Sequence, residues 1–211
     1  IRALIIFSLL VVFSFSSEAQ PQYASTVIAY STQYSTPSWA ASQATGAPNV
    51  GACGDNTSAW ASTSADGQRE YLELGFSTIQ QVNTIKIYES YAPDAVDTVY
   101  LRDQSTGLWN NVFSQTAGSA ACMKTLTITI ATTPYNVDAI RLAINSPVVA
   151  NWNEIDAVSI ENIAPMAYSS STTTQTNVTS VGASTVNNEV IGIQIVTTGS
   201  TSPLSATSFS L

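Results

Sequence analysis

Alternation of apolar and polar residues with a period of two is the feature that most limits the fold of this chain. Leu126, Ile128 and Ile130 alternate with threonines at positions 125, 127 and 129. Further strands are predicted at residues 26–30, 70–76, 82–88, 96–101, 137–144 and 155–160. Short strands separated by Gly, Pro, Asn and Asp predict an all-β sandwich or jelly roll. About 140 residues is an ordinary size for one such domain.

One short helix is expected between the first two of these strands. Thr36 is a suitable N-cap, and Pro37 suits the first helical position because its missing N–H costs nothing there. The alanine-rich residues 38–45 form the body, and Gly46 is expected to end the helix in a left-handed conformation.

The N-terminal residues predict export. Arg2 precedes an apolar run over residues 3–13, which is too short to span a bilayer, and small side chains follow at Ser17 and Ala19. This pattern predicts a signal peptide over residues 1–19, cleaved between Ala19 and Gln20. An N-terminal membrane anchor is the alternative. The mature protein is then expected to be secreted or at the cell surface, without membrane insertion.

The chain is expected to be a fragment, covalently continuous with further domains, because it begins at Ile1 and stops at Leu211 in an alternating stretch. The Ser/Thr-rich residues 163–180 are expected to be a linker. Residues 181–211 are expected to be the truncated start of a second β-sandwich domain, with strands near Val190 and Leu204. Two or three strands cannot bury a core, so this tail should leave a bare sheet edge.

The chain has few charged residues, and their balance is acidic, which limits the classes of partner it can bind. Only 9% of residues are charged, against about a quarter in an average globular protein. Solubility must come from Ser, Thr, Asn and Gln, which suits strands with one wet face. The net charge of −8 argues against nucleic acid and anionic membranes as partners.

The two cysteines, Cys53 and Cys122, are expected to form a disulfide in an oxidising compartment. A metal site with two thiolates is the alternative. Zinc would need histidines or further cysteines, and the chain has neither.

Catalysis is not expected. Without histidine there is no ordinary Ser-His or Cys-His relay and no imidazole metal site. Glu70 and Glu73 are three apart in a strand and therefore lie on opposite faces. Glu154 and Asp156 share a face, and such a pair serves a glycosidase when about 5–9 Å apart. A solvated strand end is the favoured alternative for this pair.

Six stretches resemble a discoidin-like (coagulation factor type C) domain, of the kind found in F-box/leucine-rich-repeat proteins and bacterial surface proteins. They are residues 42–50 (SQATGAPNV), 53–55 (CGD), 59–61 (AWA), 69–74 (REYLEL), 87–96 (IYESYAPDAV) and 152–158 (WNEIDAV). The resemblance implies a galactose-binding-like jelly roll over residues 23–162. Residues 188–195 (NEVIGIQI) and 197–204 (TTGSTSPL) resemble the β-domains N-terminal to BNR-repeat sialidases.

The resemblance also implies a structural Ca²⁺ held by Asp55 and Glu154, helped by Thr57 and by backbone carbonyls near Ala44. Hard oxygen ligands from two chain segments suit Ca²⁺. The Asp-Gly-Asp-like loop common in calcium-binding relatives is replaced by residues 53–56 (CGDN). Asp55 capping its own Asx turn is the alternative.

Ligand binding would use exposed aromatics at the loop end of the sandwich, because sugars present apolar C–H faces beside hydroxyls. The predicted ligand-binding residues are Tyr91, Asp94, Trp152 and Asn153, with Trp39 as a further candidate. Packing is the alternative for each ring. Trp60 is expected in the core, Trp39 against the helix and sheet, and Trp109 in a hairpin, while Trp152 stays open between packing and ligand contact.

The sequence therefore favours a non-catalytic binding or adhesion module of a larger secreted or cell-surface protein, recognising carbohydrate or another surface ligand. A structural spacer is one alternative. An accessory domain of a glycoside hydrolase whose catalytic part lies beyond residue 211 is another.

Overall fold

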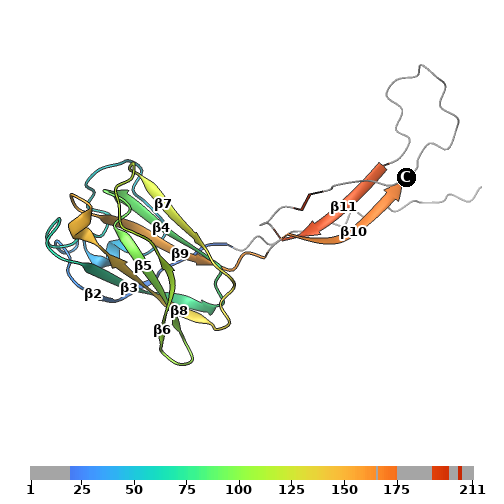
Figure 1. The fold of residues 1–211 in the computed structure, drawn as a ribbon, viewed down its shortest axis with the longest axis horizontal. Coiled ribbons are helices and arrows are strands. Elements are labelled where there is room, and N and C mark those ends of the chain that lie inside the picture. The colour runs from blue at the N-terminus through green and yellow to red at the C-terminus, as the bar shows by residue number, and fades with distance from the viewer. Residues whose placement is uncertain (1–19, 165, 175–191, 200–203, 206–211) are drawn as a thin grey trace, which may run out of the picture. The chain divides into compact units, whose positions relative to one another are not determined.

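The computed structural model describes residues 20–164, 166–174, 192–199 and 204–205 (Figure 1). The chain divides into two compact units, and one of them spans Ala19–Ile163. The predicted signal peptide lies outside the described residues.

The larger unit consists of two antiparallel sheets (Figure 1). One sheet has the order β1 (Gln22–Tyr23), β9 (Glu154–Glu161), β4 (Thr84–Tyr91) and β7 (Lys124–Thr129). The other has the order β2 (Thr26–Tyr30), β3 (Glu70–Gln80), β8 (Val137–Ile144), β5 (Val96–Asp103) and β6 (Trp109–Ser114). The all-β sandwich expected from the sequence is confirmed.

Both sheets contribute to one buried core. In the five-stranded sheet, Leu72 and Leu74 of β3 pair with Leu142 and Ile140 of β8, and all four are fully buried. Trp60, 1% exposed, also belongs to the core as expected. Burial of such side chains is the main favourable contribution to folding.

The period-two pattern holds in β7 and fails in β9. Leu126 and Ile128 of β7 are buried while the threonines between them are exposed. Every residue of β9 is buried, including Glu154 and Asp156. The expectation of one wet face is wrong for β9, and residues 49–56 bond to two of its polar side chains, Glu154 and Asp156.

The predicted helix is reduced to the single 3₁₀ turn η1 (Ala41–Ala44). Trp39 has a left-handed φ of 52°, and its N–H and C=O bond to Thr57 and Ala61 instead of to a helical turn. These contacts stop a helix from starting at Pro37. Gly46 is left-handed as expected, with φ +86°. Among the described residues, no helix has the length and hydropathy required to cross a membrane.

The predicted disulfide is confirmed. Cys53 and Cys122 are bonded, with their Cα atoms 5.5 Å apart and a sequence separation of 69. Cys53 lies in the loop that follows η1, and Cys122 lies just before β7, so the bond ties this loop to the four-stranded sheet.

After Ile163, β10 (Ala167–Thr174) pairs antiparallel with β11 (Gly192–Thr198). β10 lies within the tract expected to be a linker. Its threonines favour extended backbone, and a ladder needs backbone groups rather than an apolar period. Ile193, Ile195 and Val196 are exposed. Residues 181–191 and most of the expected return strand lie outside the described residues.

Removing the disulfide is expected to destabilise the sandwich by about 4 kcal/mol on the chain-entropy model, because the bond closes a long loop. The change is Cys53→Ser with Cys122→Ser, and the measurement is urea unfolding followed by tryptophan fluorescence. Reduced wild type is the matched control and should resemble the double variant, which itself should not respond to reductant. Equal midpoints for oxidised wild type and the double variant would contradict this prediction.

Candidate functional site

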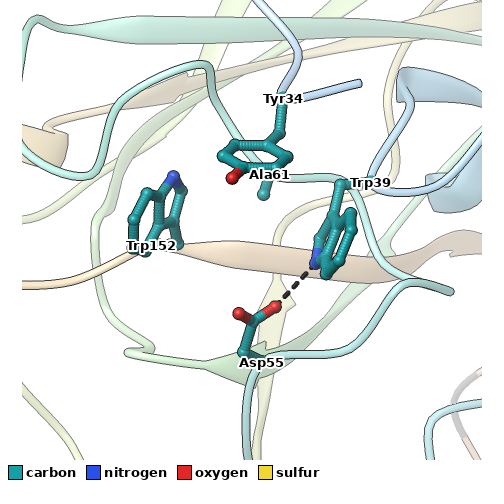
Figure 2. A pocket seen from close by; sticks show the side chains of 5 residues that line it. All are labelled: Tyr34, Trp39, Asp55, Ala61 and Trp152. Atoms are coloured by element: carbon teal, nitrogen blue, oxygen red, sulfur yellow. Dashed lines mark hydrogen bonds between the residues drawn. The ribbon is translucent and has the colours of Figure 1, made fainter. Parts of the chain in front are cut away.

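Loops at one end of the sandwich surround a small cavity of about 60 Å³ (Figure 2). Its lining residues are Tyr34, Trp39, Asp55, Ala61 and Trp152, which we call the aromatic pocket. They come from the loop between β2 and β3 and from the loop between β8 and β9. Segments far apart in sequence therefore meet here.

The three rings form adjacent walls rather than a stack. The Tyr34 ring centroid lies 5.3 Å from that of Trp39 at 69°, and 5.8 Å from that of Trp152 at 89°. Figure 2 shows Asp55 across the space from Tyr34, with the two tryptophans on either side. Tyr34 is 51% exposed and the tryptophans are half-buried, so a ligand has access to the rings.

Hydrogen bonds hold both indoles. Trp39 Nε1 donates to Asp55 Oδ1 at 2.7 Å, and Trp152 Nε1 donates to the Ser62 carbonyl at 3.1 Å. Ala61 joins the walls, because its C=O accepts from Tyr34 N–H at 2.8 Å and its N–H donates to Trp39 C=O at 3.3 Å. The pocket is therefore formed before any ligand arrives.

The pocket is also fixed to the four-stranded sheet. Trp60, next to Ala61, exchanges two backbone hydrogen bonds with Ile155 of β9. Its indole Nε1 donates to the Thr32 carbonyl at 3.0 Å, which ties down the segment leading to Tyr34. The buried core tryptophan thus positions the exposed rings.

Glu154 lies beside Asp55 and is 1% exposed. Its oxygens accept from the Asn56 N–H at 3.1 and 3.3 Å and from the Ser90 hydroxyl at 3.2 Å. Burial raises the pKa of Glu154 to about 8, and a hydrogen bond with the Asp55 carboxyl acts in the same direction. Near neutral pH this carboxyl is therefore mostly protonated.

Glu154 and Asp156, considered above as a glycosidase pair, both hold loop backbone. The Asp156 carboxylate accepts from the N–H groups of Asn49 and Val50 at 3.2 Å. Together with the Glu154 bonds to Asn56, these contacts anchor residues 49–56 on β9. The pair is buried and does not form the solvated strand end that the sequence favoured.

The structure brings some of the predicted ligand-binding residues together and separates others. Trp152 and Trp39 line the aromatic pocket, whereas Tyr91, at the end of β4, is not among its lining residues. Asp94 pairs with Lys124. Asn153 is 4% exposed, and its side chain bonds to the Ala92 carbonyl and the Ser146 hydroxyl. Ligand contact by Tyr91, Asp94 and Asn153 stays a prediction without support from the pocket.

Tyr34 received no role from the sequence. It lies among polar residues, in the run STQYSTP over residues 31–37, where a single aromatic in a turn-rich segment was the available signal. Asp55 was predicted as a calcium ligand, and the structure places it in the pocket wall instead of an Asx turn of its own. The Asx turn belongs to Asn56, whose Oδ1 accepts from Ser58 N–H at 2.9 Å.

The proposed calcium ligands Asp55 and Glu154 are adjacent, but their donor set is small. No group of three or more acidic, histidine or cysteine side chains suited to a metal occurs in the part of the chain that the structure describes. Ca²⁺ takes about six to eight oxygen ligands, and the Glu154 oxygens already accept N–H and O–H bonds. Calcium binding stays a prediction.

The two-sheet fold and the loop-end pocket define a galactose-binding-like jelly-roll sandwich. Residues 15–171 match the model of the family described as pappalysin-1, SD scarf domain, C-terminal. The chain belongs to this family. The finer resemblance to the F-box type and to the BNR-associated domains stays a prediction.

Solved structures share the fold at low sequence identity. The selenomethionine-labelled mutant of chitosan-binding module 1 from the chitosanase/glucanase of Paenibacillus sp. IK-5 is 16% identical, with a TM-score of 0.52, covering 67% of this chain and 99% of that one. Reduced XRCC1 bound to the DNA pol beta catalytic domain is 12% identical, with a TM-score of 0.52, covering 67% and 97%. No curated protein matches the chain.

The raised pKa of Glu154 predicts a pH-dependent stability. The folded chain holds the Glu154 proton up to about pH 8 and the unfolded chain releases it near pH 4.5, so the free energy of unfolding falls as pH rises between these values. Glu154→Gln stays neutral and should therefore be more stable than wild type above pH 8, with the difference vanishing near pH 4.5. Urea unfolding across this range measures the effect.

Glu89→Gln is the matched control, because burial also raises the pKa of Glu89, to about 7. The difference in the free energy of unfolding between Glu89→Gln and wild type should stop growing near pH 7. For Glu154→Gln it should stop growing near pH 8. If the free energy of unfolding depended on pH in the same way for Glu154→Gln and for wild type, the raised pKa of Glu154 would be contradicted.

Calcium binding at Asp55 and Glu154 predicts that CaCl₂ raises the melting temperature of wild type and that EDTA reverses the rise, because a ligand of the folded state stabilises it. Asp55→Asn should reduce the response. Identical melting curves in CaCl₂ and EDTA would remove the metal from this site.

Proposed function

We propose that this chain is a non-catalytic module that binds carbohydrate through the aromatic pocket. The observation that carries the proposal is the convergence of Tyr34, Trp39 and Trp152 with the Asp55 carboxylate at the loop end of the sandwich. Ring faces pack against the apolar C–H faces of a sugar, and a carboxylate accepts hydrogen bonds from its hydroxyls. Few polar groups placed among aromatic walls are typical of a ligand site.

The rigidity of the pocket supports this proposal. Both indoles are held by hydrogen bonds, and the backbone of Tyr34 is bonded to Ala61. Side chains that are already ordered lose little freedom on binding, so more of the contact energy appears as affinity. A ring that served packing alone would not need half of its surface in solvent, as Tyr34 has.

The fold by itself leaves the ligand open. One solved structure with this fold is titled a chitosan-binding module, and another is XRCC1 bound to a polymerase domain. Function depends on a site rather than on a fold. For this chain the support for a sugar comes from the side chains of the pocket rather than from the likeness.

The positions of the Glu154 and Asp156 carboxyl groups support a binding role without catalysis. Glu154 and Asp156 are occupied by loop backbone, and Glu154 is 1% exposed, so neither is placed to meet a glycosidic bond. The disulfide fits a secreted or cell-surface location, where oxidising conditions preserve it. A larger protein is part of the proposal, and glycan binding is equally compatible with an accessory domain of a glycoside hydrolase. The spacer alternative is an outcome of the test below.

Truncating a pocket ring is expected to weaken glycan binding. Tyr34→Ala and Trp152→Ala should each raise Kd by about tenfold or more, because aromatic side chains at the centre of a site carry much of its binding energy. A glycan array finds the ligand, and isothermal titration calorimetry measures the affinity.

Tyr91→Ala is the matched control, since Tyr91 is an aromatic residue near the same end of the sandwich but outside the pocket. Its affinity should equal that of wild type. A loss with Tyr91→Ala and none with Tyr34→Ala would move the site to the position predicted from sequence. No retention of wild type on any glycan would favour the spacer.

A further inference from the structure

The Lys and Arg side chains in the described part of the chain are paired with carboxylates. The five Lys and Arg side chains among the described residues all form ion pairs: Arg69 with Asp97, Lys86 with Glu161, Arg102 with Asp138, Lys124 with Asp94, and Arg141 with Glu73. Asp55 is in none of these pairs. An acidic chain of net charge −8 therefore leaves this pocket carboxylate without a cation from the described residues.

Asp55 is available to a ligand. It is exposed, and its carboxylate accepts from the indole N–H of Trp39 and is hydrogen-bonded to the neighbouring Glu154 carboxyl. The Glu154 proton adds no charge, so Asp55 keeps its negative charge. The hydrogen bond from Trp39 aims the carboxylate at the space between the rings, where Figure 2 shows it opposite Tyr34. A negative charge fixed among aromatic walls favours a positive group and repels a negative one.

The rings add to this preference. An aromatic face attracts a cation through its quadrupole, and aromatic walls around an ammonium group are a known arrangement for recognising it. Trp39 and Trp152 stand on either side of the space that Asp55 and Tyr34 close. Electrostatic attraction from the carboxylate and from the rings therefore has the same sign.

The size of the cavity limits what enters. At about 60 Å³ it is much smaller than the roughly 150 Å³ cavity that accepts benzene. A whole pyranose ring cannot fit inside, whereas a single substituent can. A sugar would thus lie over the exposed rings and insert one group.

We infer that the aromatic pocket binds a glycan carrying a protonated amine, with the ammonium group placed between Trp39 and Trp152 and paired with Asp55. This inference rests on the proposed function and adds the class of sugar. Sugars with carboxylates or sulfates are disfavoured, because they would meet Asp55 and no free cation among the described residues.

Calorimetry with matched probes tests this inference. The protein is titrated with a glucosamine oligosaccharide and with its N-acetylated counterpart of equal length, at mildly acidic pH and in EDTA. Wild type should bind the free amine at least about tenfold more tightly, because acetylation removes the charge. Asp55→Asn should lose this preference while keeping an oxygen for the Trp39 N–H.

Asp103→Asn is the matched control for charge. Asp103 is at the end of β5 that pairs with Val137, whereas Val96, at the pocket end, pairs with Ile144. The control removes one negative charge outside the pocket and should keep the preference of wild type. A preference lost equally in both variants would show general attraction to an acidic protein and would overturn the inference.

The remaining outcomes separate the two proposals. Equal affinity for both oligosaccharides, unchanged in Asp55→Asn, would overturn the amine inference and leave glycan binding intact. Tetramethylammonium tests the other source of an ammonium group. Binding of tetramethylammonium without either oligosaccharide would overturn the amino-sugar assignment while keeping the cation site, and the glycan array would then decide the proposed function. Binding of none of the three probes would overturn the inference, and the glycan array then decides the proposed function alone.

Discussion

The attachment of residues 49–56 to β9 is the constraint on which the rest of this structure depends. Buried Glu154 and Asp156 accept hydrogen bonds from three backbone N–H groups of this loop, and the Cys53–Cys122 disulfide fixes it to the start of β7. A buried carboxyl is costly unless it is hydrogen-bonded or protonated. The loop supplies the bonds, and burial raises the pKa of Glu154 so that its proton removes the charge.

The aromatic pocket is built on this attachment. Asp55 lies in the anchored loop and accepts from Trp39, and Trp60 binds the same β9 strand through its backbone. The rings are therefore positioned by a rigid strand rather than by flexible loops alone. Such rigidity favours recognition because little entropy is lost on binding. The polar side chains of β9 that hold this loop, Glu154 and Asp156, are buried, whereas Asp55 in the loop itself is exposed in the pocket wall.

The sequence predicted the sandwich well because period-two burial is local. In β7 the apolar residues are buried and the threonines are exposed, as the polarity of each side chain predicts. The strand β8 was predicted over its full length, residues 137–144. The short helix was overestimated because the backbone of Trp39 bonds to Thr57 and Ala61, partners about twenty residues away. β9 was misjudged for a similar reason, since the groups that cover its polar face come from about a hundred residues earlier.

By itself, the sequence determined an acidic, histidine-free chain with one disulfide and a jelly-roll pattern, because composition, cysteine number and alternation are properties of single residues and near neighbours. The tertiary structure alone decided the candidate site. Trp152 was found from sequence, whereas Tyr34 and the pocket role of Asp55 were not. Their meeting depends on contacts between distant segments, and no local pattern encodes which loops converge at one end of a sandwich.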